Sequence, residues 1–237
     1  NDTGTHIIPG IIKKLFAKIG AAFVVRTGNI NDVVAFVKWA KKNNETYTIR
    51  GAGTWPFGGA VPLNDDIILD LSYLGFHKLF CETDSLAFGA GFLFPDARDY
   101  LQEQGYTLKQ EITNPNSGTL AGWIVTGGLG LGSYKYGPVR DSVQMLLVVN
   151  PQGELKTLKP GEDDFDLFFG SEGQAGVVVG GALSVRKESF VTKPYAFSFE
   201  TTPNVTDYLQ RLQQRQIKPT SVIYFDRKYI SETWKIE

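Results

Sequence analysis

The segment 113–137, TNPNSGTLAGWIVTGGLGLGSYKYG, combines seven glycines with hydroxyl, aromatic and cationic side chains. Glycine lets a backbone approach a ligand closely because no Cβ stands in the way. Hydroxyls can hydrogen-bond a ligand and aromatic rings can pack near it, so the segment suits a wide planar molecule. A loop of tight turns, with its rings in the core, is the alternative. The polar and aromatic candidates are Thr119, Trp123, Thr126, Ser133, Tyr134, Lys135 and Tyr136.

Two other loops are rich in glycine. RGAGTWPFGG, residues 50–59, presents successive backbone N–H groups on small residues, which can form a nest for a phosphate or pyrophosphate. A glycine-rich hairpin turn has the same composition. GSEGQAGVV, residues 170–178, places Glu172 between glycines, where the carboxylate acts as a general base or caps backbone donors. The G-x-G-x-x-G and G-K-[ST] motifs are missing, which disfavours a Rossmann fingerprint and excludes a P-loop.

Strands and helices alternate between these loops. Residues 23–27 predict a strand, and Asn31 is the predicted N-cap of the helix that follows. Gly105 is predicted to end a second helix, which starts near residue 94. The other predicted elements are strands opening 46–62 and covering 66–74 and 85–92, a β-hairpin over 142–158, and an acidic helix start, loop and long strand within 163–187.

The pattern changes near Pro194. Residues 195–201, 204–216 and 221–230 predict a strand, a helix and a strand, which match one half of a split βαβ module. One such unit buries little apolar surface by itself. A second domain is therefore expected to begin near residue 195 and to be truncated.

Composition excludes several classes of function. Lys plus Arg (24) nearly balances Asp plus Glu (25), so the chain lacks the positive field of a dedicated nucleic-acid binder. Cys81 is the only cysteine, and His6 and His77 lie far apart in sequence. The sequence therefore predicts no disulfide, no zinc-binding pattern and no local Ser/His triad. The cysteine usage fits a reducing cytoplasm.

The apolar stretch 7–25 is too often interrupted by lysine to be a transmembrane segment. Its helical spacing predicts a short amphipathic helix with a basic far side. Such a helix docks on its own domain or, as the alternative, attaches to a membrane surface. The predicted location is cytoplasmic, with peripheral membrane contact as the alternative.

Taken in order, the three loops and the segments between them resemble the FAD-binding domain of the vanillyl-alcohol oxidase superfamily, the PCMH type. Within it the chain is most similar to the branch of D-lactate dehydrogenases, D-2-hydroxyglutarate dehydrogenases and the glycolate oxidase FAD subunit. The resemblance covers roughly residues 20–190. It implies an α+β fold with FAD between two subdomains. The implied domains are a FAD-binding domain at 1–194, with subdomains at about 1–75 and 76–194, and the beginning of a ferredoxin-like cap at 195–237.

The resemblance also implies which residues contact FAD. The pyrophosphate would bind the amides of Gly51, Ala52, Gly53 and Thr54, near Gly58 and Gly59. The flavin and ribityl contacts would be Pro115, Gly118, Thr119, Gly122, Trp123, Thr126 and Gly127, with Ser133, Tyr136 and Gly137 closing the stretch. The adenosine end would be formed by Glu172, Gly176, Val177 and Val178. Relatives with a covalent flavin carry a His where this chain has Thr54, so the resemblance implies noncovalent FAD.

The chemistry implied by this branch is oxidation of a D-2-hydroxy acid. The flavin accepts a hydride from the carbon that bears the hydroxyl, while a base takes the hydroxyl proton. Relatives hold the substrate with cap histidines, including an H-x-H-x-x-D-G-N pattern that supports a metal, and this sequence lacks the pattern. No catalytic or metal-binding residue is therefore assigned. Lys135, Arg140 and Arg227 are cations that face the substrate or form surface ion pairs.

Two other functions stay open. One is an alkylglycerone-phosphate synthase-like flavoenzyme, which shares the GSEG motif but has an Arg where Ile223 aligns. The other is a noncatalytic FAD-binding or electron-transfer subunit, completed by another polypeptide or an iron–sulfur partner. Each of these functions is compatible with a homo-oligomer.

Overall fold

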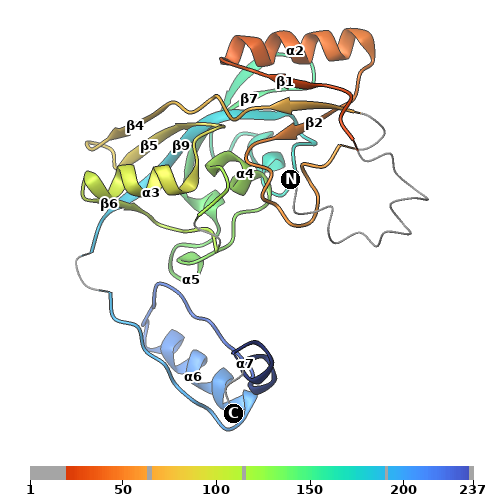
Figure 1. Cartoon of the computed structure of the whole chain (residues 1–237). Helices are drawn as coiled ribbons and strands as arrows, with labels where there is room; N and C mark the ends of the chain where they lie inside the picture. Colours follow the sequence, from red (N-terminus) through yellow and green to blue (C-terminus); the bar gives the residue numbers. More distant parts are fainter. Residues whose placement is uncertain (1–19, 63–65, 114–115, 190–191, 235–237) are drawn as a thin grey trace.

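The computed structural model describes residues 20–62, 66–113, 116–189 and 192–234 (Figure 1). Most of the helix predicted near the N-terminus, and the predicted FAD contact Pro115, lie outside these residues. Within them helices and strands mix in the α+β manner expected from the sequence. Among the described residues, no helix has the length and apolarity needed to cross a membrane.

A three-stranded parallel sheet is formed by β1 (Val24–Arg26), β2 (Tyr47–Arg50) and β3 (Ile67–Asp70), in the order β1-β3-β2. Consecutive parallel strands in one sheet need a connection that returns the chain from the C-terminal to the N-terminal end of the strands. Helix α2 (Ile30–Asn43) makes this connection between β1 and β2, and the glycine-rich segment 51–66 makes it between β2 and β3. The return path explains why a long loop leaves the end of β2.

The N-cap of α2 is Asn29, so the prediction of Asn31 is wrong. The Asn29 side chain accepts a hydrogen bond from the backbone N–H of Asp32, and the Asp32 carboxylate accepts one from the backbone N–H of Asn29. This reciprocal pair is a capping box. Asn31 also has a suitable side chain, but it lacks an acidic residue three positions later, whereas Asn29 has one. The buried stripe of α2 is Val33, Phe36, Val37 and Ala40, as predicted.

The second sheet has the strand order β4-β5-β9-β7-β8, with β6 pairing the far end of β9. Its strands run antiparallel to their neighbours, and the predicted hairpin over 142–158 is confirmed as β7 and β8. The bounds are His77–Phe80 for β4, Ser85–Gly89 for β5, Tyr106–Leu108 for β6, Val143–Val149 for β7, Leu155–Leu158 for β8 and Val177–Lys187 for β9. Helix α3 (Phe94–Glu103) ends as predicted, since Gly105 follows its C-cap with φ +73°.

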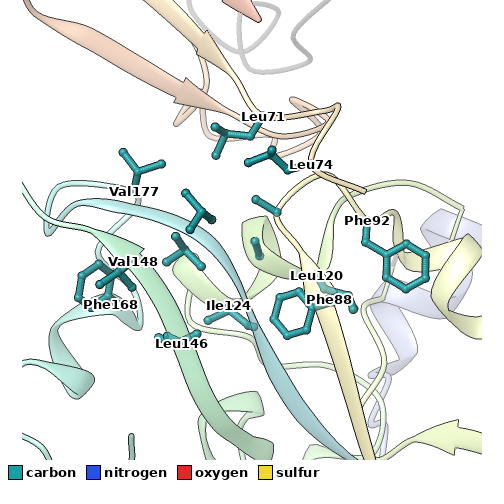
Figure 2. Packing of buried hydrophobic residues seen from close by; sticks show 14 of the residues in the cluster. Leu71, Leu74, Phe88, Phe92, Leu120, Ile124, Leu146, Val148, Phe168 and Val177 are labelled. Atoms are coloured by element: carbon teal, nitrogen blue, oxygen red, sulfur yellow. The ribbon is translucent and has the colours of Figure 1, made fainter. Parts of the chain in front are cut away.

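A continuous hydrophobic core joins the two sheets around the short helix α4 (Leu120–Val125). Figure 2 shows Leu71 and Leu74, which follow β3, on one side of Leu120 and Ile124, and Phe88 and Leu146 of the second sheet on the other. Leu120 and Ile124 are fully buried. The core therefore fixes α4, and the glycine-rich segment around it, between the two sheets.

The C-terminal segment contains helices α6 (Thr202–Gln214) and α7 (Arg227–Trp234), at the opposite end of the molecule from α2 (Figure 1). The predicted helix over 204–216 is confirmed, but the strands predicted over 195–201 and 221–230 are wrong. A strand needs a neighbouring strand to pair its backbone groups, and neither described sheet includes these segments. Earlier in the chain, the predicted acidic helix start is only a short 3-10 turn, η3 (Phe165–Phe168).

Tyr106 on β6 gives a prediction for the pH dependence of stability. Its hydrogen bond with the Asp84 side chain, reinforced by burial, raises the pKa of the phenol to about 12. Between pH 10 and 12 the unfolded chain loses this proton while the folded chain keeps it, so folding loses stability as pH rises through that window. In urea unfolding, the stability of the parent relative to Tyr106→Phe is expected to decline from pH 10 to 12. A constant difference would contradict this assignment.

Candidate functional site

A cavity of about 410 Å³ lies where the three glycine-rich loops meet, and its volume is in the usual range for ligand pockets. One wall is the segment after β2, another is α4 with the residues before it, and the third is the loop before β9. The predicted site residues that line the cavity are Gly51, Ala52, Gly53, Thr54, Gly59, Gly118, Thr119, Gly122, Trp123, Thr126, Glu172, Gly176 and Val178.

Residues 51–54 line this cavity with a run of backbone N–H groups. Within the described chain, none of the four donates a hydrogen bond to another residue. The last pairing between β2 and β3 in this region is the Leu71 N–H with the Arg50 carbonyl, at 2.9 Å. Gly53 then takes φ +67°, which turns the chain away from the sheet. Successive unpaired amides at such a turn form a nest that binds an anionic oxygen.

Gly51 and Thr119 bring the first loop against the start of α4. An ideal Cβ on Gly51 would lie 2.7 Å from Thr119 Oγ1, so only glycine allows this approach. Thr119 is buried, and its Oγ1 accepts a hydrogen bond from the Gly122 N–H at 3.0 Å, which caps α4. The threonine hydroxyl is therefore fixed in position beside the amide nest.

The third loop reaches the cavity through Glu172. Its backbone N–H donates to the Val125 carbonyl at 2.9 Å, and its φ of +50° is unusual for a residue other than glycine. The carboxylate faces the first loop, because an ideal Cβ on Gly59 would lie 2.9 Å from Glu172 Oε2. Glu172 thus joins the end of α4 to the far end of the 51–59 loop.

Other predicted site residues do not line the cavity, and their role in binding stays a prediction. Ser133 Oγ accepts a hydrogen bond from the Gly130 N–H at 3.0 Å, in the turn before α5 (Ser133–Tyr136). The ring of Tyr136 packs under the Lys135 ammonium, 5.2 Å from the ring centroid. The predicted residues outside the lining are Gly58, Gly127, Ser133, Tyr136, Gly137 and Val177.

Gln110 holds the loop that contains Tyr136 and Gly137. Its buried side-chain amide donates to the carbonyls of Tyr136, Gly137 and Pro138, at 3.1, 3.1 and 3.2 Å. Its amide oxygen accepts from Ser142 Oγ at 2.8 Å. Gln110 was not predicted, because a lone glutamine before a loop gives no sequence signal of its partners.

The cavity also has lining residues that the sequence analysis missed. Most are apolar and complete its walls around the polar loops. Trp55 differs, because its indole Nε1 is buried without a hydrogen-bond partner in the described chain. The additional lining residues are Ile49, Trp55, Pro56, Ala60, Leu71, Ala90, Ile112, Thr113, Ala121, Val125, Leu129 and Gly173.

A second hollow, of about 530 Å³, opens beside α3 and shares Ala52 and Thr119 with the first. His77 lies in it, stacked on Phe92 with 4.2 Å between ring centroids. The third glycine-rich loop does not contribute to this hollow. The first cavity is therefore the candidate site, since all three loops meet there.

Comparison with known proteins agrees with this geometry. Residues 21–159 match the model of a protein family described as "FAD binding domain". The match contains the amide nest, α4 and the hairpin that follows. The chain belongs to this FAD-binding domain family.

Relatives of this FAD-binding domain include two enzymes of different activity. Alkyldihydroxyacetonephosphate synthase of Trypanosoma brucei brucei is 27% identical over 214 residues, which cover 86% of this chain and 35% of the relative. D-2-hydroxyglutarate dehydrogenase of Xanthomonas citri pv. viticola is 31% identical over 164 residues, covering 66% of this chain and 35% of the relative. The chain therefore spans about a third of the length of these relatives.

A solved structure confirms the architecture. An alkyldihydroxyacetonephosphate synthase superposes with a TM-score of 0.73 and 24% identity, covering 83% of this chain and 40% of the other. At this identity the likeness concerns the fold. The α+β architecture predicted for the FAD-binding domain is confirmed, and the ferredoxin-like nature of the segment after residue 194 stays a prediction.

The donors and the apolar walls of the cavity suit FAD. The pyrophosphate of FAD is an anion, and residues 51–54 offer it four unpaired amides. The missing side chains of Gly51 and Gly59 let the first loop approach Thr119 and Glu172 closely. The apolar wall residues, Leu71 and Ala90 among them, suit the faces of flat rings. FAD is thus the cofactor indicated by both the family and the site.

Proposed function

We propose that this chain is the FAD-binding part of an oxidoreductase that oxidises a D-2-hydroxy acid, such as D-lactate, D-2-hydroxyglutarate or glycolate. The unpaired amides of residues 51–54 at the cavity carry the proposal, because they support binding of a dinucleotide flavin. When bound, the flavin supplies an acceptor for the hydride from the substrate carbon. The dehydrogenases among the relatives support this choice of reaction.

The residues of the chain have separate roles in this proposal. The 51–54 amides bind the pyrophosphate, and the capped Thr119 fixes the position of the nest against α4. The glycines of α4 and its flanks let the flavin half lie along the backbone. Glu172 faces the adenosine half. Apolar lining residues exclude water from the rings and orient them.

FAD is proposed to bind noncovalently. Thr54, which stands where covalent relatives carry a His, lines the cavity with a hydroxyl side chain that forms no covalent bond to flavin. Cys81 is exposed in the turn after β4, outside the cavity lining. Neither Thr54 nor Cys81 is therefore proposed to form a covalent bond to the flavin.

The substrate base is not assigned to a residue of this chain. Arg140, one of the cations considered above, pairs with Asp166 at 2.6 Å, which supports a structural role. Residues 195–237 are proposed to begin the substrate domain that follows the FAD-binding domain at 1–194, with subdomains at about 1–75 and 76–194. This division is supported by the two sheets, whose strands lie within 24–70 and 77–187. An iron–sulfur protein or another acceptor is proposed to take the electrons.

A second candidate function is that of an alkyldihydroxyacetonephosphate synthase-like flavoenzyme. Its support is the trypanosomal synthase, which is 27% identical over 86% of this chain. The two candidates differ in the fate of the flavin. A dehydrogenase substrate reduces the flavin and bleaches it, whereas the synthase reaction has no net redox change.

Absorbance of the full-length gene product tests both the cofactor and the reaction. Purified protein is expected to show flavin bands after incubation with FAD and gel filtration. Acid precipitation should release all the flavin into the supernatant, and colour on the precipitate would contradict noncovalent binding. Under anaerobic conditions one of D-lactate, D-2-hydroxyglutarate or glycolate should bleach the bands. Persistent bands with all three would contradict the proposed dehydrogenase activity, while absence of bands would contradict FAD binding.

A further inference from the structure

Trp55 contributes a polar group that no residue of the described chain satisfies. Its indole Nε1 is buried and has no hydrogen-bond partner, while the side chain is part of the cavity wall. A buried N–H without an acceptor is unfavourable, because the group has lost its hydrogen bonds to water. Trp55 follows the last residue of the amide nest directly. A ligand in the nest would therefore lie close to this unused donor.

The surroundings of Trp55 bring this side chain and a carboxylate acceptor to the same glycine. An ideal Cβ on Gly59 would lie 3.3 Å from Trp55 Cδ1 and 2.9 Å from Glu172 Oε2. The indole and the carboxylate therefore both lie against Gly59. Phe57 packs edge-on against the Trp55 ring, with 5.1 Å between centroids, and supports its orientation.

The two ends of the 51–59 loop contact different parts of the cavity. At its start, Gly51 approaches Thr119, and Thr54 Oγ1 lies 3.4 Å from an ideal Cβ on Gly118. At its end, Gly59 approaches Glu172. The two halves of a dinucleotide leave the pyrophosphate in opposite directions. One half would follow the glycine-rich segment from Gly118, and the other would follow Trp55 and Glu172.

We propose that Trp55 is a specificity-determining residue for the adenosine half of FAD. Its Nε1–H donates a hydrogen bond to an oxygen of the adenosine diphosphate half, while Glu172 accepts one from the same half. A small side-chain rotation on binding, as is common at binding sites, brings the indole donor to the ligand. The pair makes the cavity select FAD over FMN. This inference rests on the proposed binding of FAD in the cavity.

Calorimetric titration of the full chain with FAD, ADP and FMN tests the role of Trp55. Trp55→Phe keeps an aromatic ring and removes the N–H, so it is expected to weaken FAD and ADP binding by about tenfold, one hydrogen bond. FMN affinity should stay unchanged. Trp39→Phe, on the exposed face of α2, is the matched control and should bind all three ligands like the parent. Unchanged FAD affinity in Trp55→Phe, or an equal loss for FMN, would overturn the proposal.

Indole N–H resonances of ¹⁵N-labelled parent protein provide a second readout that needs no variant to bind ligand. The chain has four tryptophans, and the signal missing from the Trp55→Phe spectrum assigns Trp55. Addition of ADP should shift that signal downfield, as expected for a new hydrogen bond, and FMN should leave it in place. If the protein binds FAD but ADP leaves the chemical shift of the Trp55 signal unchanged, the role of Trp55 is overturned and the proposed FAD binding is not. Failure of the parent to bind FAD would instead overturn the proposed function.

Discussion

The Gly51→Ala variant is expected to bind FAD about 100-fold more weakly than the parent. The new Cβ would lie 2.7 Å from Thr119 Oγ1, too close for a stable contact. Thr119 cannot rotate away freely, because its hydroxyl caps α4 through the Gly122 N–H at 3.0 Å. The first loop must therefore move and misalign its amides. Losing two charge-assisted hydrogen bonds of about 1.5 kcal/mol each corresponds to about 100-fold in affinity.

Gly75→Ala is the matched control for this prediction. An ideal Cβ on Gly75 meets no atom within 4 Å, and the residue does not line the candidate FAD cavity. Titration with FAD should therefore give the parent affinity for Gly75→Ala. Thermal unfolding of both apo proteins would show whether the alanine at position 51 also weakens the fold. A Gly51→Ala protein with parent FAD affinity would contradict the role of the 51–54 nest.

The sequence predicted many of the residues that line the glycine-rich part of the candidate cavity, because glycine positions and a helix cap are local features. Glycines at 51 and 53, and the Thr119 cap followed by Gly122, leave a signal within a few neighbouring residues. The apolar walls leave no comparable signal. Leu71 and Ala90 resemble ordinary core residues in sequence, and only the packing of the two sheets brings them to the cavity. Trp55 was missed because its unpaired N–H can be recognised only when its surroundings are known.

The C-terminal segment shows the limit of reading strands from alternation alone. Tyr195, Phe197 and Phe199 alternate as a half-buried strand would, yet their exposed fractions are 75, 59 and 37%. Alternation indicates which face of a segment is apolar. A strand also requires a neighbouring strand whose backbone groups form hydrogen bonds with its own. The strand predictions in the first sheet are confirmed, because β3 lies between β1 and β2 and pairs with both. The helix over 202–214 forms its backbone hydrogen bonds within itself and needs no neighbouring segment. Its prediction from the sequence is therefore confirmed.

Phe88→Ala is expected to lower the free energy of unfolding by about 3–5 kcal/mol, the usual cost of removing a buried phenylalanine ring. Phe88 is fully buried on β5 and pairs with Gly181 of β9. An ideal Cβ on Gly181 would lie 3.1 Å from Phe88 Cζ, so the ring fills the space that the glycine leaves. Alanine would open a cavity between the second sheet and α4. Urea unfolding of the apo protein measures the loss, because bound FAD would add its own stabilisation.

Phe23→Ala removes the same ring from an exposed site, since Phe23 is 69% exposed. Its carbonyl still accepts the hydrogen bond from the Ile68 N–H, which does not involve the side chain. Surface substitutions of this kind change stability by about 0.5 kcal/mol or less. The contrast between the two variants separates the cavity cost from a general effect of losing a phenylalanine. Equal stability losses in the two variants would contradict the placement of Phe88 in a core shared by the second sheet and α4.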